Sequence, residues 1–184
     1  MKRKLFIILL AGLMVAPAGL MAQKVYNATG GGYTRLLLDM TDMPAGAITA
    51  TSKGSGATLA SVAANETVFQ RLEIAKQDMA GTNAAPALAA TGTDMTWADA
   101  NTRCEGLTYN GRDNWRLPTQ RELMMMWIFR TAINTLSGTS FYSSYYWSAT
   151  ESNVNDAWYV YFAGGDTYGN VKATSYRVRC VSEF

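Results

Sequence analysis

Histidine is absent from all 184 residues of the sequence. This absence excludes Ser-His-Asp and Cys-His catalysis, zinc sites that need an imidazole ligand, and haem bound through histidine. It also removes the side chain that most often transfers protons near pH 7. An enzyme of this composition would depend on carboxylates, lysine, tyrosine or a lone cysteine, and we find no motif for one. We therefore expect neither catalysis nor a bound metal or cofactor.

A surplus of basic residues is also missing. The chain has 16 Lys and Arg against 14 Asp and Glu, and Lys2, Arg3 and Lys4 lie at its very start. Without these three, acidic side chains slightly outnumber basic ones. Because nucleic-acid binding requires a basic stripe or patch, we expect no nucleic-acid partner.

Long apolar runs are scarce, and the clearest one, Leu5–Val15, directly follows the N-terminal basic residues. Its length is typical of a signal peptide and too short for a membrane-spanning helix. A helix-breaking segment, Ala16-Pro17-Ala18-Gly19, and small residues before Gln23 complete the pattern. We predict that residues 1–22 are a signal peptide and that the mature chain has no transmembrane segment. The protein is then exported to the periplasm, the cell surface or the medium; an uncleaved anchor is the alternative.

Only two cysteines are present, Cys104 and Cys180. In an oxidising compartment an even pair of cysteines favours a disulfide. Closing so long a loop contributes about 4–5 kcal/mol on the chain-entropy model. The alternative, a redox-active or nucleophilic cysteine, requires a lowered pKa and a nearby base.

The chain length favours one folded domain with extensions. Residues 23–67 are expected to form an N-terminal extension or linker, because residues 44–65 consist largely of Ala, Gly, Thr and Ser. Within the extension, Tyr33–Met40 has the pattern of a strand with Leu36 and Leu38 on one face. Residues 68–184 are expected to be the folded domain, beginning with a strand over Val68–Met79.

Two helices are predicted in the middle of the chain. Over Thr96–Leu107, the apolar residues recur at helical spacing and place Cys104 on the inward face. Thr119 and Glu122 form a capping box that begins a second helix, which extends to about Leu136. This helix is apolar nearly all round, which predicts burial on more than one side.

Alternation of apolar and polar residues predicts strands over the rest of the chain. The inward-facing positions expected from this alternation are Trp147, Trp158, Val160, Phe162, Val178 and Cys180. The sequence therefore predicts an α+β fold in which two helices pack on an antiparallel β-sheet. The positions between the apolar ones are mostly Tyr, Ser, Asn, Asp, Gly and Thr, which is the composition of a binding surface.

Four segments, taken in order, carry a resemblance to a known family. They are Met95-Thr96-Trp97-Ala98-Asp99-Ala100 followed by Cys104; Trp115-Arg116-Leu117-Pro118-Thr119; Tyr146-Trp147-Ser148-Ala149-Thr150-Glu151 with Ala157-Trp158-Tyr159-Val160; and Val178-Arg179-Cys180-Val181. Together they resemble the bacterial family typified by the C-terminal domain of the Legionella collagen-like protein. The resemblance covers roughly Val68 to Phe184 and implies a C-type-lectin-like fold.

The C-terminal segment also resembles the variable proteins of diversity-generating retroelements. In those proteins, selected codons are rewritten by adenine-directed mutagenesis and come to encode Tyr, Ser, Asp, Gly, Thr, Ala, Val or Asn. The resemblance implies a variable surface that binds a protein or glycan on another cell or surface. Its candidate residues are Tyr142, Ser143, Ser144, Tyr145, Tyr146, Asn153, Asn155, Asp156, Tyr159, Tyr161, Asp166, Tyr168, Asn170, Ser175 and Tyr176.

Other interpretations remain open. Neither Pro86 nor Pro118 lies in the Glu-Pro-Asn or Gln-Pro-Asp triplet of calcium-dependent lectins, and no dense acidic loop is present. Formylglycine-generating enzymes share the lectin-like superfamily, and Glu122 with Glu151 is the one candidate carboxylate pair. An ordinary fixed sheet with polar loops, or a fimbria-associated structural subunit, would also fit the sequence.

Overall fold

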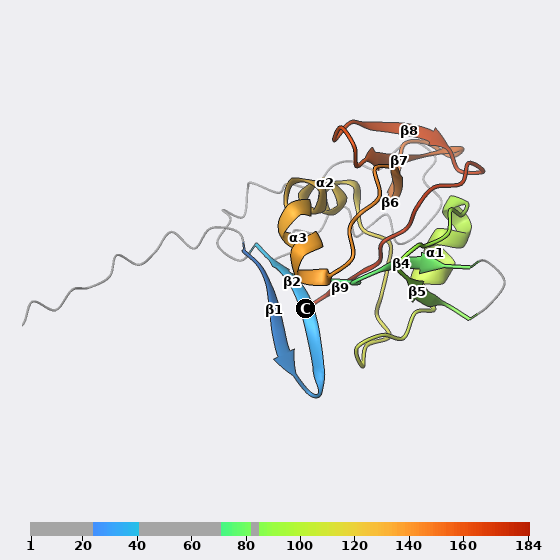
Figure 1. Cartoon of the computed structure of the whole chain (residues 1–184). Coiled ribbons are helices and arrows are strands. Elements are labelled where there is room, and N and C mark those ends of the chain that lie inside the picture. Colours follow the sequence, from blue (N-terminus) through green and yellow to red (C-terminus); the bar gives the residue numbers. More distant parts are fainter. Residues whose placement is uncertain (1–23, 41–70, 82–84) are drawn as a thin grey trace, which may run out of the picture.

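The computed structural model describes residues 24–40, 71–81 and 85–184 (Figure 1). The predicted signal peptide and the Ala/Gly-rich residues 44–65 lie outside these ranges. Three helices are present in the described part: α1 (Trp97–Glu105), α2 (Gln120–Ile128) and α3 (Arg130–Ser137). The strands are β1 (Lys24–Gly30), β2 (Tyr33–Asp39), β3 (Arg71–Ile74), β4 (Asp78–Ala80), β5 (Ala87–Ala89), β6 (Tyr145–Glu151), β7 (Asp156–Tyr161), β8 (Thr167–Val171) and β9 (Val181–Glu183).

The strands form three antiparallel sheets, ordered β1-β2-β3-β9, β4-β5 and β6-β7-β8. Figure 1 shows α2 and α3 between the long β1–β2 hairpin and the β6–β7–β8 sheet, with α1 and β4–β5 beside them. The expected α+β class with antiparallel sheets is therefore confirmed. None of the helices in the described part of the chain has the length and apolar character needed to cross a bilayer.

The second predicted helix is two helices in the structure. Phe129 leaves helical geometry, with φ −92° and ψ 10°, and separates α2 from α3. At this break the Arg130 guanidinium donates to the carbonyl of Trp127 at 2.9 Å and lies 4.4 Å from its ring centroid. The carbonyl of Trp127 also accepts from the backbone N–H of Phe129, so it is satisfied at the break. The predicted capping box of Thr119 and Glu122 is confirmed at the start of α2.

The hairpin β1–β2 corrects the predicted domain boundary at residue 68. In β2, Leu36 pairs with Ile74 and Leu38 with Leu72 of β3. Both leucines are fully buried, as the strand pattern predicted. Residues 24–40 therefore belong to the same folded unit as the C-terminal strand β9, and the part of the extension that the structure describes is not a linker.

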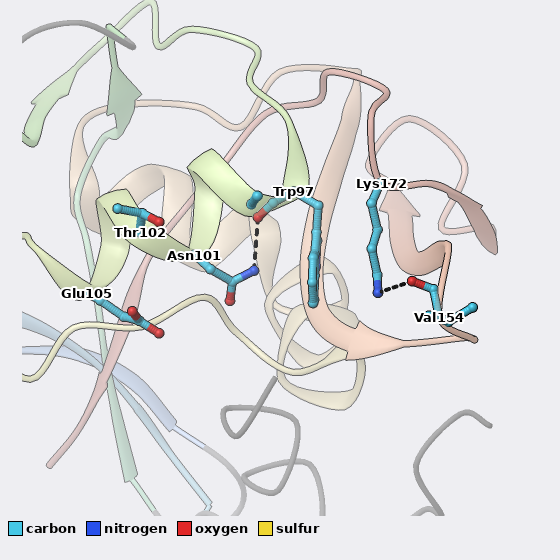
Figure 2. Close-up of a pocket in the computed structure, with 7 residues that line it drawn as sticks. Trp97, Asn101, Thr102, Glu105, Val154 and Lys172 are labelled. Atoms are coloured by element: carbon cyan, nitrogen blue, oxygen red, sulfur yellow. Dashed lines mark hydrogen bonds between the residues drawn. The ribbon is translucent and has the colours of Figure 1, made fainter. Parts of the chain in front are cut away.

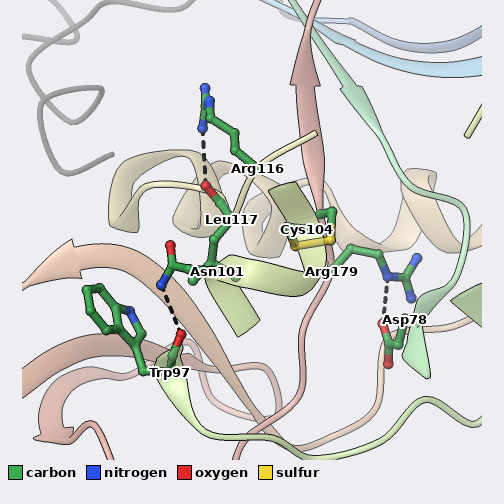
Figure 3. Close-up of a disulfide and its surroundings, with 8 residues drawn as sticks. Asp78, Trp97, Asn101, Cys104, Arg116, Leu117 and Arg179 are labelled. Atoms are coloured by element: carbon green, nitrogen blue, oxygen red, sulfur yellow. Dashed lines mark hydrogen bonds and ion pairs between the residues drawn. A yellow bond between two sulfur atoms is a disulfide. The ribbon is translucent and has the colours of Figure 1, made fainter. Parts of the chain in front are cut away.

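Two clusters of buried side chains hold the elements together. One, which we call the α2 cluster, lies between the β1-β2-β3-β9 sheet, α2, α3 and the inner side of β6–β7. The other surrounds α1 and includes Trp115, Trp147 and both cysteines. The predicted disulfide is confirmed: Cys104 and Cys180 are bonded, with a Cα–Cα distance of 5.6 Å (Figure 3). It ties α1 to the segment that leads into β9.

One of the predicted core positions is not in either cluster. Trp158 is only half-buried, although Val160 and Phe162, next along the same face of β7, belong to the α2 cluster. Trp158 lies nearer the β6–β7 turn, and its partner in β8 is Gly169, which has no side chain to cover it. The alternation correctly predicted that Trp158 lies on the same face of β7 as Val160 and Phe162. It could not predict that no other element fully covers that face at Trp158.

We predict that Gly165→Ala lowers the free energy of unfolding by about 3 kcal/mol. Gly165, in the β7–β8 turn, has φ +88°, and an added Cβ would overlap the indole of Trp127. That indole anchors the turn to α2 by donating to Phe162 O at 3.2 Å. Urea denaturation of the two proteins measures the change.

Gly138→Ala is the matched control, because Gly138 has a similar φ of +71° with no atom within 4 Å of the added Cβ. It reports the backbone cost alone, about 1–2 kcal/mol. Equal losses in the two variants would contradict the proposed close packing of Trp127 on the turn.

Candidate functional site

Tyrosines gather on one face of the β6-β7-β8 sheet. The register places Tyr145 opposite Tyr161, and Tyr159 opposite both Trp147 and Tyr168. Directly opposed residues in antiparallel strands project on the same side of the sheet. The rings of Tyr145 and Tyr161 stack, with centroids 4.7 Å apart and an interplanar angle of 29°. Tyr159 lies 5.2 Å from Tyr145 and 6.3 Å from Tyr168.

A fifth tyrosine reaches this cluster from the C-terminal segment. Tyr176 exchanges backbone hydrogen bonds with Met95, and its ring lies 5.0 Å from both Tyr145 and Tyr159. Its hydroxyl accepts a hydrogen bond from Asn170 Nδ2 at 2.6 Å. We call the set the tyrosine face and define it as Tyr145, Tyr159, Tyr161, Tyr168 and Tyr176.

The tyrosine face rests on a fully buried tryptophan. Trp147 lies 4.6 Å from the ring of Tyr176 and 6.5 Å from that of Tyr159. Its indole nitrogen donates to Met95 O at 3.1 Å, which fixes the ring in place. The outer tyrosines stay accessible: Tyr168 is 59% exposed and Tyr145 is 39% exposed. The face is thus an ordered aromatic layer open to solvent on one side.

The hydroxyl of Tyr159, near the centre of the tyrosine face, is held in its neutral form. Burial raises the pKa of Tyr159, and the neighbouring Tyr176, Tyr145, Tyr168 and Asp166 raise it further because each disfavours a phenolate there. Its hydroxyl therefore stays protonated and can both donate and accept hydrogen bonds. This chemistry suits polar, uncharged groups of a partner.

Arg177, which was not among the predicted site residues, connects Tyr142 to the edge of the tyrosine face. The guanidinium of Arg177 lies 4.4 Å from the ring centroid of Tyr142, and its Nε is 2.7 Å from Asp94 Oδ1. It also donates to Thr91 O, and its backbone N–H donates to Tyr145 O. Val178 and Cys180 were predicted to face inward, so alternation along the strand places the neighbouring Arg177 outward, and this is the sequence signal for it.

Three predicted residues lie at the other end of the sheet, in the β6–β7 turn. Asn153 Oδ1 accepts the backbone N–H groups of Asn155 and Asp156 at 2.8 and 3.0 Å. Asn153 Nδ2 donates to Asp156 Oδ2 at 2.8 Å. These side chains stabilise the turn, and the length of β7 separates them from the pair Tyr145–Tyr161. The structure does not bring them into the tyrosine face.

Four further predicted residues surround the face in turns or at strand ends. Backbone carbonyls of Ser144 and Asp166 accept from Phe162 and Tyr161, at 2.9 and 2.7 Å, and so fix the turns on either side of the sheet. The remaining side chains, of Ser143 and Ser175, are exposed, as is that of Asp166.

Tyr146 corrects the predicted surface, because its side chain is fully buried. Successive residues of a strand point to opposite faces, so Tyr146 points away from Tyr145 and into the α2 cluster. Its hydroxyl donates to Asp78 Oδ2 at 2.8 Å and accepts the backbone N–H of Tyr142 at 3.0 Å. Burial and the Asp78 carboxylate raise its pKa far above the usual value. Tyr146 is a core residue.

The carboxylates considered for catalysis are held in ion pairs. Glu122 accepts from both terminal nitrogens of Arg116, at 2.6 and 2.7 Å, as well as capping α2. Glu151 Oε2 lies 2.7 Å from Lys172 Nζ. Among the described residues, no three His, Cys, Asp or Glu side chains gather as a metal site would require. Asp156 is the first residue of β7 and Asp166 follows the other end of that strand, so the two carboxylates do not meet.

One protein-family model matches most of the part of the chain that the structure describes. The model for the Lcl C-terminal domain covers residues 70–182. This span includes both cysteines and every residue of the tyrosine face. No curated protein matches the chain significantly. Because the matched span exceeds half of the chain, the protein belongs to the Lcl C-terminal domain family.

Proposed function

We propose that the protein is an exported ligand-binding protein, used in receptor recognition or adhesion, whose tyrosine face captures a protein or glycan. The observation that carries this proposal is the packing of five tyrosines on one another and on Trp147. Rings already held in place lose little conformational freedom on binding, so more of the contact energy becomes affinity. Tyrosine also offers a large amphipathic contact area with few rotatable bonds.

The family and the architecture both support this proposal. Membership in the Lcl C-terminal domain family suggests a surface or adhesion-type domain. We infer that the fold is C-type-lectin-like, because the N-terminal strands pair beside the C-terminal β9 and a long-range disulfide ties α1 to the same region. On such a scaffold the exposed side chains on the outer face of a sheet can be replaced without disturbing the core.

We further propose that the candidate positions are diversified by a retroelement. Tyr146 apart, the candidate side chains are exposed or half-buried, whereas Trp147, Ala149, Val160 and Phe162 between them are buried. This separation is what tolerance of rewriting requires. The proposal expects a near-repeat of the 3′ end of the gene, differing at template adenines, beside a reverse-transcriptase frame. A genomic neighbourhood with neither feature would leave a fixed binding domain.

Replacing Tyr142, Tyr145, Tyr161 and Tyr168 together by alanine is expected to weaken ligand binding at least 100-fold. The partner is first identified by probing protein and glycan arrays with the labelled mature protein, and affinity is then measured by surface plasmon resonance. The melting temperature should fall only slightly, because Tyr142, Tyr145 and Tyr168 are the exposed members of the set and the buried Trp147 is retained.

Tyr33→Ala with Ile128→Ala is the matched control, since both side chains are exposed, at 41% and 54%, and neither lies on the β6-β7-β8 sheet. This variant should bind normally. If the quadruple variant keeps its affinity while remaining folded, the tyrosine face is not the binding surface.

A further inference from the structure

A cleft separate from the tyrosine face opens along the outer side of α1. Its volume is about 360 Å³, within the range of small-molecule sites. It is lined by Ala98, Asn101, Thr102 and Glu105 of α1, by Val154 of the β6–β7 turn, and by Lys172, which follows β8. Trp97 also lines it, and Figure 2 shows Glu105 and Lys172 on opposite sides of Trp97 and Asn101.

Each side-chain nitrogen in the walls of the cleft donates at least one hydrogen bond within the protein. Lys172 Nζ donates to Glu151 Oε2 at 2.7 Å and to Val154 O at 2.8 Å, and it lies 4.6 Å from the ring centroid of Trp97. The Trp97 indole nitrogen donates to Ser148 O at 2.7 Å. Asn101 Nδ2 donates to Trp97 O at 2.9 Å (Figure 2). After these bonds, one N–H of Lys172 and one N–H of Asn101 are left for a ligand.

Acceptors remain at the other side of the cleft. Asn101 is 96% buried, and its Oδ1 makes no hydrogen bond with any described residue. Glu105 follows four residues later on the same face of α1, and its carboxylate has no partner within the described ranges. The hydroxyl of Thr102 lies beside them. Three acceptors thus face one end of the cleft.

The charge at this end is negative. Lys172 is neutralised by Glu151, so Glu105 supplies the net charge of the walls. Glu105 is also the last residue of α1, where the helix dipole favours a cation. The basic residue of that last turn, Arg103, projects to the opposite face and donates to Ala80 O at 2.8 Å.

We propose that the cleft binds a primary ammonium group on a short apolar stem. The three N–H donors of an ammonium match Asn101 Oδ1, the Glu105 carboxylate and the Thr102 hydroxyl. The stem would lie along Ala98 and Val154, the second of which is 52% exposed. Such a group is offered both by a free alkylamine and by the side chain of a lysine in a protein or peptide.

The test uses two probes, n-butylamine and Nα-acetyl-lysine methylamide, titrated into the full mature protein. We expect saturable changes in the NMR signals of the Asn101 side-chain amide and the Trp97 indole. Binding of both probes assigns the site to a lysine side chain, and binding of n-butylamine alone assigns it to a free amine. n-Butanol, which keeps the stem without the charge, should not saturate the site.

Glu105→Gln should weaken binding about tenfold, because it removes the charge from a charge-assisted hydrogen bond. Asp113→Asn is the matched control: Asp113 is also an exposed acid and does not line the cleft, so its loss should leave the affinity unchanged. Equal affinity in Glu105→Gln, equal binding of n-butanol, or absence of saturation with both amines would each overturn the proposal.

Discussion

Replacing Cys104 and Cys180 together by alanine will lower the free energy of unfolding by about 4–5 kcal/mol. The disulfide closes a loop with a sequence separation of 76 residues, and the chain-entropy cost of leaving such a loop open in the unfolded state is large. Guanidinium denaturation of the mature oxidised protein and of the double variant measures the difference. Both cysteines are fully buried, so two small cavities add to the loss.

The reduced wild-type protein is the control for this experiment, because it loses the cross-link and keeps both side chains. Its stability should fall by nearly as much as that of the double variant. A loss below about 1 kcal/mol in both samples would mean that the unfolded chain is already constrained without the disulfide.

Features decided by neighbouring residues were predictable from the sequence. The capping box at Thr119 and Glu122 is confirmed because both partners lie within one turn of the helix. The inward face of α1, with Cys104, is confirmed because a period near 3.6 residues fixes it. Predicting the disulfide required only the number of cysteines and the expected oxidising compartment.

Features decided by distant segments were not predictable. The pairing of β2 with β3 depends on a partner more than thirty residues away, beyond the low-complexity stretch, and no local pattern in β2 specifies it. The break at Phe129, where Arg130 bonds back to Trp127, leaves no mark in the local apolar pattern. The apolar pattern of residues 119–136 therefore predicted one continuous helix.

The candidate site shows the same division. Alternation along β7 places Tyr159 and Tyr161 on one face, and the structure agrees. Tyr145 and Tyr146 both precede Trp147, and composition cannot say which is outward; the register against Val160 and Tyr161 decides it. Tyr176 joins the face from a segment without regular strand structure, held by Met95.

Arg179→Met is expected to destabilise the fold by about 3–5 kcal/mol, because it leaves a buried carboxylate without its cation. Arg179 and Asp78 are both fully buried, and Arg179 Nε lies 2.6 Å from Asp78 Oδ1 (Figure 3). The same guanidinium donates to the carbonyls of Ala75 and Lys76 at 3.1 and 3.0 Å, and it lies 4.4 Å from the ring of Phe141. Urea denaturation measures the loss.

Arg71→Met is the matched control. Arg71 also pairs through Nε with an aspartate, Asp39 at 3.1 Å, and also lies over an aromatic ring, but its side chain is 35% exposed. Water reaches the Arg71 guanidinium, and the buried Asp39 keeps a hydrogen bond from Tyr26 at 3.3 Å, so the loss should cost no more than about 1 kcal/mol. Similar losses in Arg71→Met and Arg179→Met would show that burial does not set the strength of the Asp78–Arg179 pair.

The buried pair also connects the core to the proposed binding surface. Tyr146 donates to Asp78 and accepts from the backbone N–H of Tyr142, so one hydroxyl joins the ion pair to the start of the tyrosine-rich segment. In a double-mutant cycle, Arg179→Met and Tyr146→Phe should therefore lose less together than the sum of their separate losses, because both act on Asp78. Additive losses would show that Tyr146 and Arg179 act on the stability of the fold independently of each other.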